Sequence, residues 1–270
     1  MAGVVVVFDF DKTIIDCDSD NWVIDELGFT ELFEELLPTM PWNTLMDRMM
    51  NELHANGKTI KDIEESLKTA PIDPNVITMI KAAYALGCDL RVVSDANQFF
   101  IETILRHHGL KDYFTEINTN PGYVDAEGRL RIFPYHDFHK SSHGCDLCPP
   151  NMCKSKILER IITSASADGK KRFIYLGDGK GDYCPSLHLS ESDFVMPRKY
   201  YPMWELINSN PHMPKAEVHE WTYGEDQARK LLQLINKVAV NALLSAECKF
   251  ENIPLSQNAG LTHLALRVPN

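Results

Sequence analysis

The chain has 270 residues, which is long enough for one large α/β domain or for a core domain with an inserted cap. Its 27 lysines and arginines are outnumbered by 38 aspartates and glutamates, and the formal net charge at pH 7 is −11. An acidic protein repels a phosphate backbone, so we expect no nucleic-acid partner. The N-terminal residues lack the pattern of a secretory signal or a membrane-spanning segment, which predicts a cytoplasmic protein without a membrane partner.

The first predicted element is a buried strand over residues 4–8, which are four valines and a phenylalanine. Asp9 and Asp11 follow it directly, and Thr13 comes two residues later. Open α/β sheets build their sites at the carboxyl ends of parallel strands. The two carboxylates therefore predict that the chemistry begins at this strand end.

A helical pattern then covers residues 16–69, with helices expected over 22–37, 42–55 and 60–67. This block predicts a helical cap that is inserted into the core after the first strand.

The cap begins with an alternating acidic stretch, Asp16, Asp18 and Asp20, which precedes Trp22. These carboxylates and the indole ring would attract a cationic head group. Alternatively, the stretch is a solvated loop in which Asp20 caps a helix that begins near residue 21. The residues alone leave both interpretations open.

Strands and helices alternate along the rest of the core, which predicts βαβ units and a parallel sheet. Strands are expected over 90–93 and 173–176, and helices over 74–86, 98–108 and 155–162. Ser94 and Asp95 follow the first of these strands, and Asp178 follows the second after one glycine. We expect the core to comprise residues 1–15 and 70–240.

A second insertion is predicted over residues 114–152, with a β-hairpin that turns near 126–128 and then a cysteine-rich loop. One amphipathic helix is expected over 225–244. Residues 245–270 have no clear period, which predicts a loosely ordered tail.

Three of the seven cysteines lie close together in that loop, at Cys145, Cys148 and Cys153. Their spacing partly matches a structural Zn²⁺ site. The candidates for a fourth ligand are His139, His143 and Cys184. Because the spacing is looser than in a paired zinc knuckle, we favour an ordinary thiol-rich loop that supports the following helix.

Phosphoryl transfer needs a nucleophile, a proton donor for the leaving group and positive charge on the phosphate oxygens. Asp9 would be the nucleophile and form an aspartyl-phosphate, and Asp11 would protonate the leaving oxygen and then activate water. Clustered carboxylates favour a divalent cation, and all-oxygen ligands favour Mg²⁺. Asp178 would complete that metal site, with Asp182 as a further ligand or supporting group.

The phosphate would also be bound by groups at two helix starts. The Ser94 hydroxyl and nearby backbone N–H groups could bind phosphate oxygens. Lys154, at the start of another helix, would supply a fixed cation.

Four ordered segments resemble the motifs of the haloacid dehalogenase superfamily of aspartate-nucleophile phosphatases: residues 9–13, residues 92–94, Lys154 and residues 177–182. Longer strings within this match resemble the phosphoethanolamine/phosphocholine phosphatase family, particularly its plant members. These strings are residues 94–97, 148–154 and 181–185. The resemblance implies a Rossmann-like parallel sheet core with an inserted helical cap and a small β-hairpin insertion.

The resemblance also implies roles for single residues. Asp9 would be nucleophile and metal ligand, Asp11 acid/base and a ligand through its carbonyl, and Asp178 the third protein ligand. Ser94 and Lys154 would bind phosphate, with Lys154 preferred over Lys156 because it lies where the family's helix begins. The residues expected to bind or select the substrate are Thr13, Asp20 and Asp95.

The leading functional hypothesis is a Mg²⁺-dependent phosphatase for a small-molecule phosphate ester, most simply phosphoethanolamine or phosphocholine. Asp20, Asp95 and Trp22 would suit these cationic leaving groups. An inorganic pyrophosphatase is the alternative, and its anionic leaving group would need cap cations such as Lys12, Arg48 or Lys68. Thiamine monophosphate is a third substrate to consider. A non-catalytic phosphate-binding protein on the same fold is the alternative from another class, and the oligomeric state stays open.

Overall fold

The computed structural model describes residues 3–167, 169 and 171–251. The strands are β1 Val4–Phe8, β2 Asp89–Asn97, β3 Glu116–Asn120, β4 Gly122–Val124, β5 Leu130–Ile132, β6 Arg172–Gly177, β7 Phe194–Pro197 and β8 Glu217–Val218. The α-helices are α1 Ser19–Glu26, α2 Thr30–Leu36, α3 Trp42–Ala55, α4 Ile60–Lys68, α5 Pro74–Ala85, α6 Gln98–His107, α7 Lys154–Ala167, α8 Lys180–Ser186, α9 Pro202–Ser209 and α10 Gly224–Glu251. Two short 3-10 helices are η1 Leu37–Thr39 and η2 Lys111–Tyr113.

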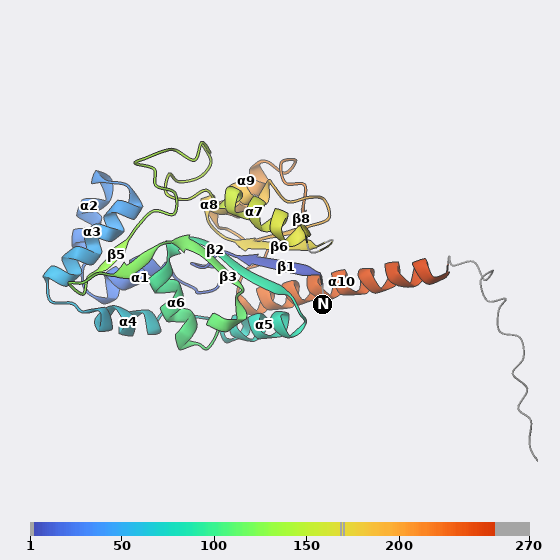
Figure 1. The fold of residues 1–270 in the computed structure, drawn as a ribbon, viewed down its shortest axis with the longest axis horizontal. Coiled ribbons are helices and arrows are strands. Elements are labelled where there is room, and N and C mark those ends of the chain that lie inside the picture. The colour runs from blue at the N-terminus through green and yellow to red at the C-terminus, as the bar shows by residue number, and fades with distance from the viewer. Residues whose placement is uncertain (1–2, 168, 170, 252–270) are drawn as a thin grey trace, which may run out of the picture.

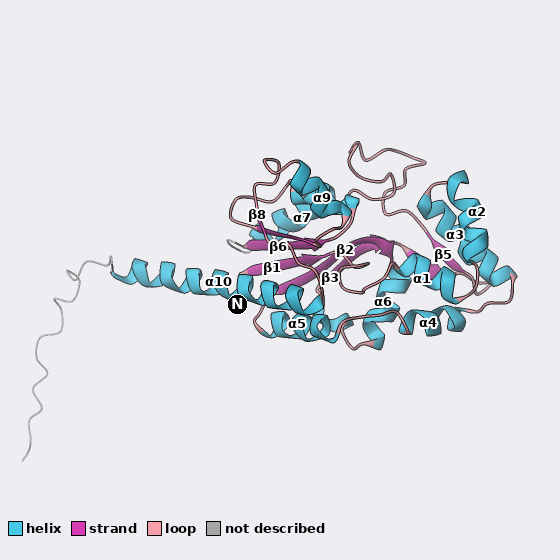
Figure 2. Cartoon of the chain, turned by 180° about the vertical axis from the view of Figure 1, so that it is seen from behind, coloured by secondary structure: helices cyan, strands magenta, loops and turns pink. Residues whose placement is uncertain are grey.

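The described residues form a six-stranded sheet in the order β3-β2-β1-β6-β7-β8, in which every neighbouring pair is parallel. β1 lies between β2 and β6, with Val6 opposite Leu90 on one side and Ile174 on the other. Helices cover both faces of this sheet (Figure 2). The arrangement confirms the predicted α/β fold, and it brings the carboxyl ends of β1, β2 and β6 to one edge.

The apolar run in β1 is buried on both of its sides. Val4, Val6 and Phe8 belong to a core cluster that includes residues of α5, α6 and α10, whereas Val5 and Val7 pack in a second cluster with residues of α7 and α9. Side chains alternate between the faces of a strand, so a central strand that is covered on both faces needs apolar residues at every position. This explains why the first strand lacks a polar alternation.

The helices α1–α4 gather at one end of the sheet, where they are drawn in blue to cyan shades (Figure 1). The single helix expected over 22–37 is wrong, because the chain forms α1 and α2 instead. Gly28, at φ +81°, ends the first of them in a left-handed conformation that favours glycine. The capping residue is Asp18, whose Oδ1 accepts from the Asn21 N–H at 3.1 Å, and not Asp20.

The predicted hairpin is confirmed by antiparallel pairing of β4 and β5. It contacts α3, where Arg131 donates to both carboxylate oxygens of Asp47 at 2.8 and 2.9 Å. The expected insertion over 114–152 is too wide, however, because β3 pairs with β2 in the main sheet. Only the segment after β3 lies outside that sheet.

The C-terminal helix α10 packs on α5 and then extends beyond the sheet (Figure 1). It is longer than the expected helix over 225–244 and includes 245–251, so the predicted start of the tail at 245 is wrong. The rest of that predicted tail, 252–270, lies outside the described residues.

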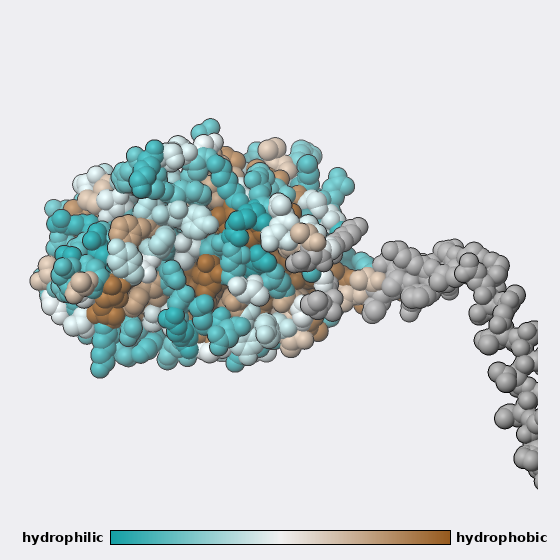
Figure 3. Space-filling view, in the orientation of Figure 1, coloured by the Kyte–Doolittle hydropathy of each residue, from teal (hydrophilic) through white to brown (hydrophobic). Residues whose placement is uncertain are grey.

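The face seen in Figure 3 is mostly hydrophilic, with hydrophobic residues in small separate spots. Among the described residues, no helix is both long and apolar enough to cross a bilayer.

Candidate active site

The centre of the site is a buried ion pair between Asp9 and Lys154. The Nζ atom of Lys154 lies 2.9 Å from Asp9 Oδ1 and 2.8 Å from Asp182 Oδ1, and the lysine side chain is only 3% exposed. The Phe10 N–H also donates to Asp9 Oδ1, at 2.7 Å. Lys154 begins α7 and Asp9 follows β1, so the sheet edge brings them together as predicted.

Asp182 connects Lys154 with the β6–α8 turn. Its Oδ1 accepts from Lys154 and from the Tyr175 hydroxyl at 2.7 Å, and its Oδ2 accepts from the N–H groups of Asp178 and Gly179 at 3.2 and 2.9 Å. A Cβ on Gly177 would lie 2.5 Å from Asp182 Cγ, so this position requires glycine. Four donors on one carboxylate make Asp182 the group that orients the lysine and the turn.

The carboxylates of Asp9, Asp178 and Asp182 form a group whose possible ligand oxygens lie within 4.8 Å of one another. Burial, and then repulsion from Asp182, raises the pKa of Asp178 to about 7 and raises the pKa of Asp9 well above its ordinary value. Lys154, Lys12 and Arg198 offset part of this repulsion at Asp178, but the pKa stays raised. Hard, anionic oxygen donors with excess negative charge fit Mg²⁺.

The Asp11 side chain turns toward α1. Its Oδ1 accepts from the Ser19 N–H at 3.0 Å and its Oδ2 accepts from the Ser19 hydroxyl at 3.2 Å. Burial, followed by repulsion from Asp18 and Asp20, raises the pKa of Asp11. A carboxyl whose pKa is raised keeps its proton to a higher pH, which suits a general acid.

The loop after β1 is held by two residues that the sequence analysis did not identify. Arg198 donates to the Lys12 carbonyl oxygen at 2.8 Å, and the Gln227 side chain donates to the Thr13 carbonyl oxygen at 3.0 Å. Lys12 has a positive φ of 52°, an uncommon conformation for a residue other than glycine. The sequence does contain a signal for Arg198, because the apolar run 194–197 directly before it marks the end of another strand. Gln227 lies on α10 and has no comparable signal.

Thr13 was expected to bind substrate, but its hydroxyl donates to Asp178 Oδ1 at 3.4 Å. It lines a different cavity from the one beside Asp9. Its position therefore suits orientation of Asp178 rather than contact with a leaving group.

Ser94 is fully buried, and its Oγ accepts from the Ala96 N–H at 3.3 Å. The strand β2 continues to Asn97, so Ser94 lies four residues before α6 and not at the helix start. Asn97 caps that helix, with its Oδ1 accepting from the Phe100 N–H. Asp95 is half exposed and lies 4.0 Å from Lys154 Nζ.

Asp20 is buried between the helical block and the sheet. Its Oδ2 accepts from the Trp42 indole N–H at 2.7 Å, and its Oδ1 accepts from the Asn97 amide at 3.5 Å. Burial, followed by repulsion from Asp18, raises the pKa of Asp20 to about 8. Trp22 points elsewhere, because its indole N–H donates to the Ser66 carbonyl oxygen at 3.0 Å.

The raised pKa of Asp20 predicts a pH-dependent stability. The native state holds one more proton than the unfolded state between about pH 4 and pH 8, so the free energy of unfolding falls as pH rises through this window, by at most ~1.4 kcal/mol per pH unit. Asp20→Asn, which stays neutral and still accepts from Trp42, should remove this contribution. Urea unfolding at pH 5 to 8 measures it. The exposed Asp25→Asn on the same helix is the control, and identical pH slopes for both variants and the unmodified chain would contradict the assignment.

A cavity of about 440 Å³ opens beside Asp9 and Lys154. Its other lining residues are Asp95, Asp146, Leu147, Cys148, Pro149, Gly179, Lys180, Gly181 and Asp182. The predicted site residues that are not part of this lining are Asp11, Thr13, Asp20, Ser94 and Asp178. The wall thus combines the sheet edge with the loop that precedes α7.

The family model described as "Putative Phosphatase" matches residues 4–235. The chain belongs to this family. This phosphatase is 58% identical over 274 residues to inorganic pyrophosphatase 2 of Arabidopsis thaliana, covering 99% of the chain and 96% of the relative. It is 32% identical over 242 residues to the Homo sapiens phosphoethanolamine/phosphocholine phosphatase, covering 86% of the chain and 89% of the relative.

The fold of this phosphatase is similar to that of the substrate-bound phosphoserine phosphatase complex, with a TM-score of 0.55 at 15% identity. The superposition covers 86% of this chain and 97% of that chain. The predicted haloacid dehalogenase-like fold and membership of a phosphatase family are thereby confirmed, and the chain is a phosphoester hydrolase.

Proposed function

We propose that the chain is a Mg²⁺-dependent phosphatase for small phosphate monoesters with a cationic leaving group, such as phosphoethanolamine or phosphocholine. The observation that supports this most is the charge of the cavity wall. Four aspartates and two lysines line the cavity, and one of the lysines, Lys154, is already paired with Asp9 and Asp182. Asp95 and Asp146 are then available to a leaving group that carries an ammonium.

In this proposal Asp9 is the nucleophile. Lys154 and the Phe10 N–H both contact Oδ1, so Oδ2 is the oxygen that would attack phosphorus and displace the alcohol. The products of this step are an aspartyl-phosphate and the free alcohol. Lys154 would fix the orientation of the carboxylate and offset charge on the phosphate oxygens.

Asp11 would donate a proton to the leaving oxygen and then remove one from the water that hydrolyses the aspartyl-phosphate. Its raised pKa supports the first role, and the Ser19 contacts from α1 keep its carboxyl fixed. The helices α1–α4 would form a cap that closes on the substrate and excludes bulk water.

Mg²⁺ would be held by Asp9, Asp178 and the Asp11 carbonyl, with Asp182 as a supporting group because its oxygens already accept four hydrogen bonds. When bound, the ion neutralises charge on the phosphate and orients it for in-line attack. Thr13 would keep Asp178 in place.

Pyrophosphate is the second candidate substrate, because the relative that is 58% identical is named an inorganic pyrophosphatase. An anionic leaving group would need free cations in the cap. Lys12, Arg48 and Lys68 do not line the cavity, and the latter two lie beside Glu52 and Glu65 as ion pairs. Lys180 does line the cavity, but four aspartates outnumber it and Lys154 there, so the charge of the wall favours the monoester.

The test is the kcat/KM for phosphoethanolamine, phosphocholine, pyrophosphate and thiamine monophosphate, each with Mg²⁺ and with EDTA. We expect the two cationic monoesters to exceed pyrophosphate, and EDTA to abolish turnover until Mg²⁺ is restored. Asp95→Asn and Asp146→Asn should each lower kcat/KM for the monoesters by about tenfold and leave or raise that for pyrophosphate.

Asp137→Asn is the matched control, since Asp137 lies in the same loop but pairs with the exposed Lys140. A preference for pyrophosphate, or a specificity ratio that neither cavity variant changes, would overturn the proposal.

A further inference from the structure

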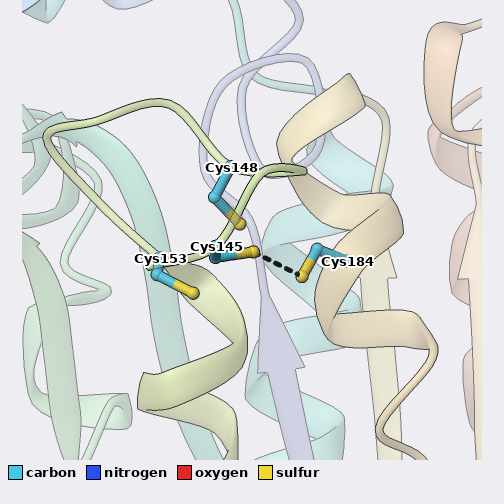
Figure 4. A group of neighbouring side chains, drawn as sticks. All are labelled: Cys145, Cys148, Cys153 and Cys184. Carbon is cyan, nitrogen blue, oxygen red and sulfur yellow. Dashed lines mark hydrogen bonds between the residues drawn. The ribbon is translucent and has the colours of Figure 1, made fainter. Parts of the chain in front are cut away.

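Four cysteine side chains converge beside the active site, three from the loop before α7 and one from α8 (Figure 4). The Sγ atoms of Cys145, Cys148, Cys153 and Cys184 all lie within 4.8 Å of one another. Cys145 Sγ is 3.5 Å from Cys184 Sγ. We propose that these four thiolates bind one structural Zn²⁺ ion.

The geometry is close to that of a zinc tetrathiolate. Zinc–sulfur bonds of about 2.3 Å in a tetrahedron place the sulfur atoms about 3.8 Å apart. No two of the four Sγ atoms are more than 4.8 Å apart, so no pair needs to approach by more than about 1 Å to reach this arrangement. A disulfide would link two of them at about 2.05 Å and leave the other two thiols unused.

The four sulfur ligands favour Zn²⁺ over Mg²⁺, the metal proposed for the catalytic centre. Thiolates are soft ligands that favour Zn²⁺, whereas Mg²⁺ requires oxygen. The sequence left His139, His143 and Cys184 as possible fourth ligands. In the described part of the chain the group contains Cys184 and neither histidine, and His143 instead accepts from the Cys145 N–H at 3.1 Å.

Nearby polar groups support the cluster. The Ser155 Oγ lies 2.5 Å from Cys184 Sγ, where its hydroxyl can donate to the thiolate. The Cys153 N–H donates to His136 Nδ1 at 3.2 Å, which fixes the end of the loop. Such outer contacts orient ligands in structural metal sites.

The zinc would position active-site residues without touching the substrate. Cys153 directly precedes Lys154, Cys184 follows Asp182 by two residues, and Cys148 lines the cavity. One ion would therefore fasten the loop that carries Asp146 to the start of α7 and to α8. The cysteine-rich loop would thereby help to position active-site residues, which a loop of free thiols without a metal would not do.

The first test is the metal content of the full chain, purified under reducing conditions and measured by inductively coupled plasma mass spectrometry. We expect about one zinc per chain, retained after EDTA has removed Mg²⁺ and released by a mercurial thiol reagent. Replacement by Co²⁺ should produce the visible d–d and thiolate-to-metal charge-transfer bands of a tetrahedral thiolate site.

Cys148→Ala and Cys184→Ala should each reduce the zinc content to below about 0.2 per chain and lower the melting temperature. Cys88→Ala is the matched control, because Cys88 is a buried free thiol outside the group, and it should retain the metal. The zinc content of the unmodified chain tests the proposal by itself. The test therefore still works if one of the variants fails to fold.

Three results would overturn the proposal. One is a chain that stays below about 0.1 zinc, both as purified and after incubation with Zn²⁺ and reductant. Another is full zinc content in both cluster variants. The third is a disulfide between cluster cysteines in the native protein, which mass spectrometry of peptides would detect.

Discussion

Asp9→Asn should reduce phosphate release by about four orders of magnitude or more, because an amide oxygen is a far weaker nucleophile than a carboxylate. The substitution is nearly isosteric, and the asparagine Oδ1 still accepts from Lys154 and the Phe10 N–H. The loss should therefore be confined to chemistry. Phosphate release and acid-quench detection of the phosphorylated enzyme measure it.

A matched control separates this effect from a general loss of charge. Asp112→Asn changes an exposed aspartate in η2 and should leave activity and melting temperature unchanged. The Asp9 variant should also keep its circular dichroism spectrum. If it retained more than a tenth of the activity, or still formed the phosphorylated enzyme, the assigned nucleophile would be wrong.

Lys154→Met should destabilise the protein by about 3–5 kcal/mol and abolish turnover. Removal of the ammonium leaves Asp9 and Asp182 buried without their cation, and an uncompensated buried charge is costly. Methionine has a similar length, so the loss of packing is small. Urea unfolding gives the free energy, and phosphate release gives the activity.

The double variant Lys154→Met with Asp182→Asn removes one of the stranded charges. It should recover part of the stability and none of the activity. Lys156→Met is the matched control on the same helix, where Lys156 is exposed, and it should affect neither quantity. A cost below ~1 kcal/mol for Lys154→Met would contradict the argument from buried charge. Loss of activity in Lys156→Met, with activity retained in Lys154→Met, would reverse the roles of the two lysines.

Much of the fold could be predicted because its signals are local. The continuous apolar runs of β1, β2 and β6 and the helical periodicity of α3 are strong signals, and each element was expected near its observed place. The strand β3 was missed because Glu116–Asn120 contains one apolar residue among five. Its strand conformation depends on hydrogen bonds to β2 at the sheet edge, which no local pattern reports.

Some positions in the candidate site could likewise be predicted from the sequence, and others could not. Asp9, Asp178 and Lys154 were identified from strand ends and from the resemblance, and the structure brings them together. Thr13 and Asp20 were expected at the substrate but lie outside the cavity lining. Their hydrogen-bond partners, Asp178 and Trp42, are 165 and 22 residues away in the chain, so their contacts could not be inferred from neighbours.

The sequence by itself determined the main strands and helices of the core and the residue types at the strand ends, because periodicity and residue type act locally. Only the tertiary structure decided that Asp182 binds Lys154, that Arg198 and Gln227 hold the loop after β1, and that a fourth cysteine joins the other three. These contacts join residues that are far apart in the chain. Their energy is gained only when the sheet has placed both partners at the same edge.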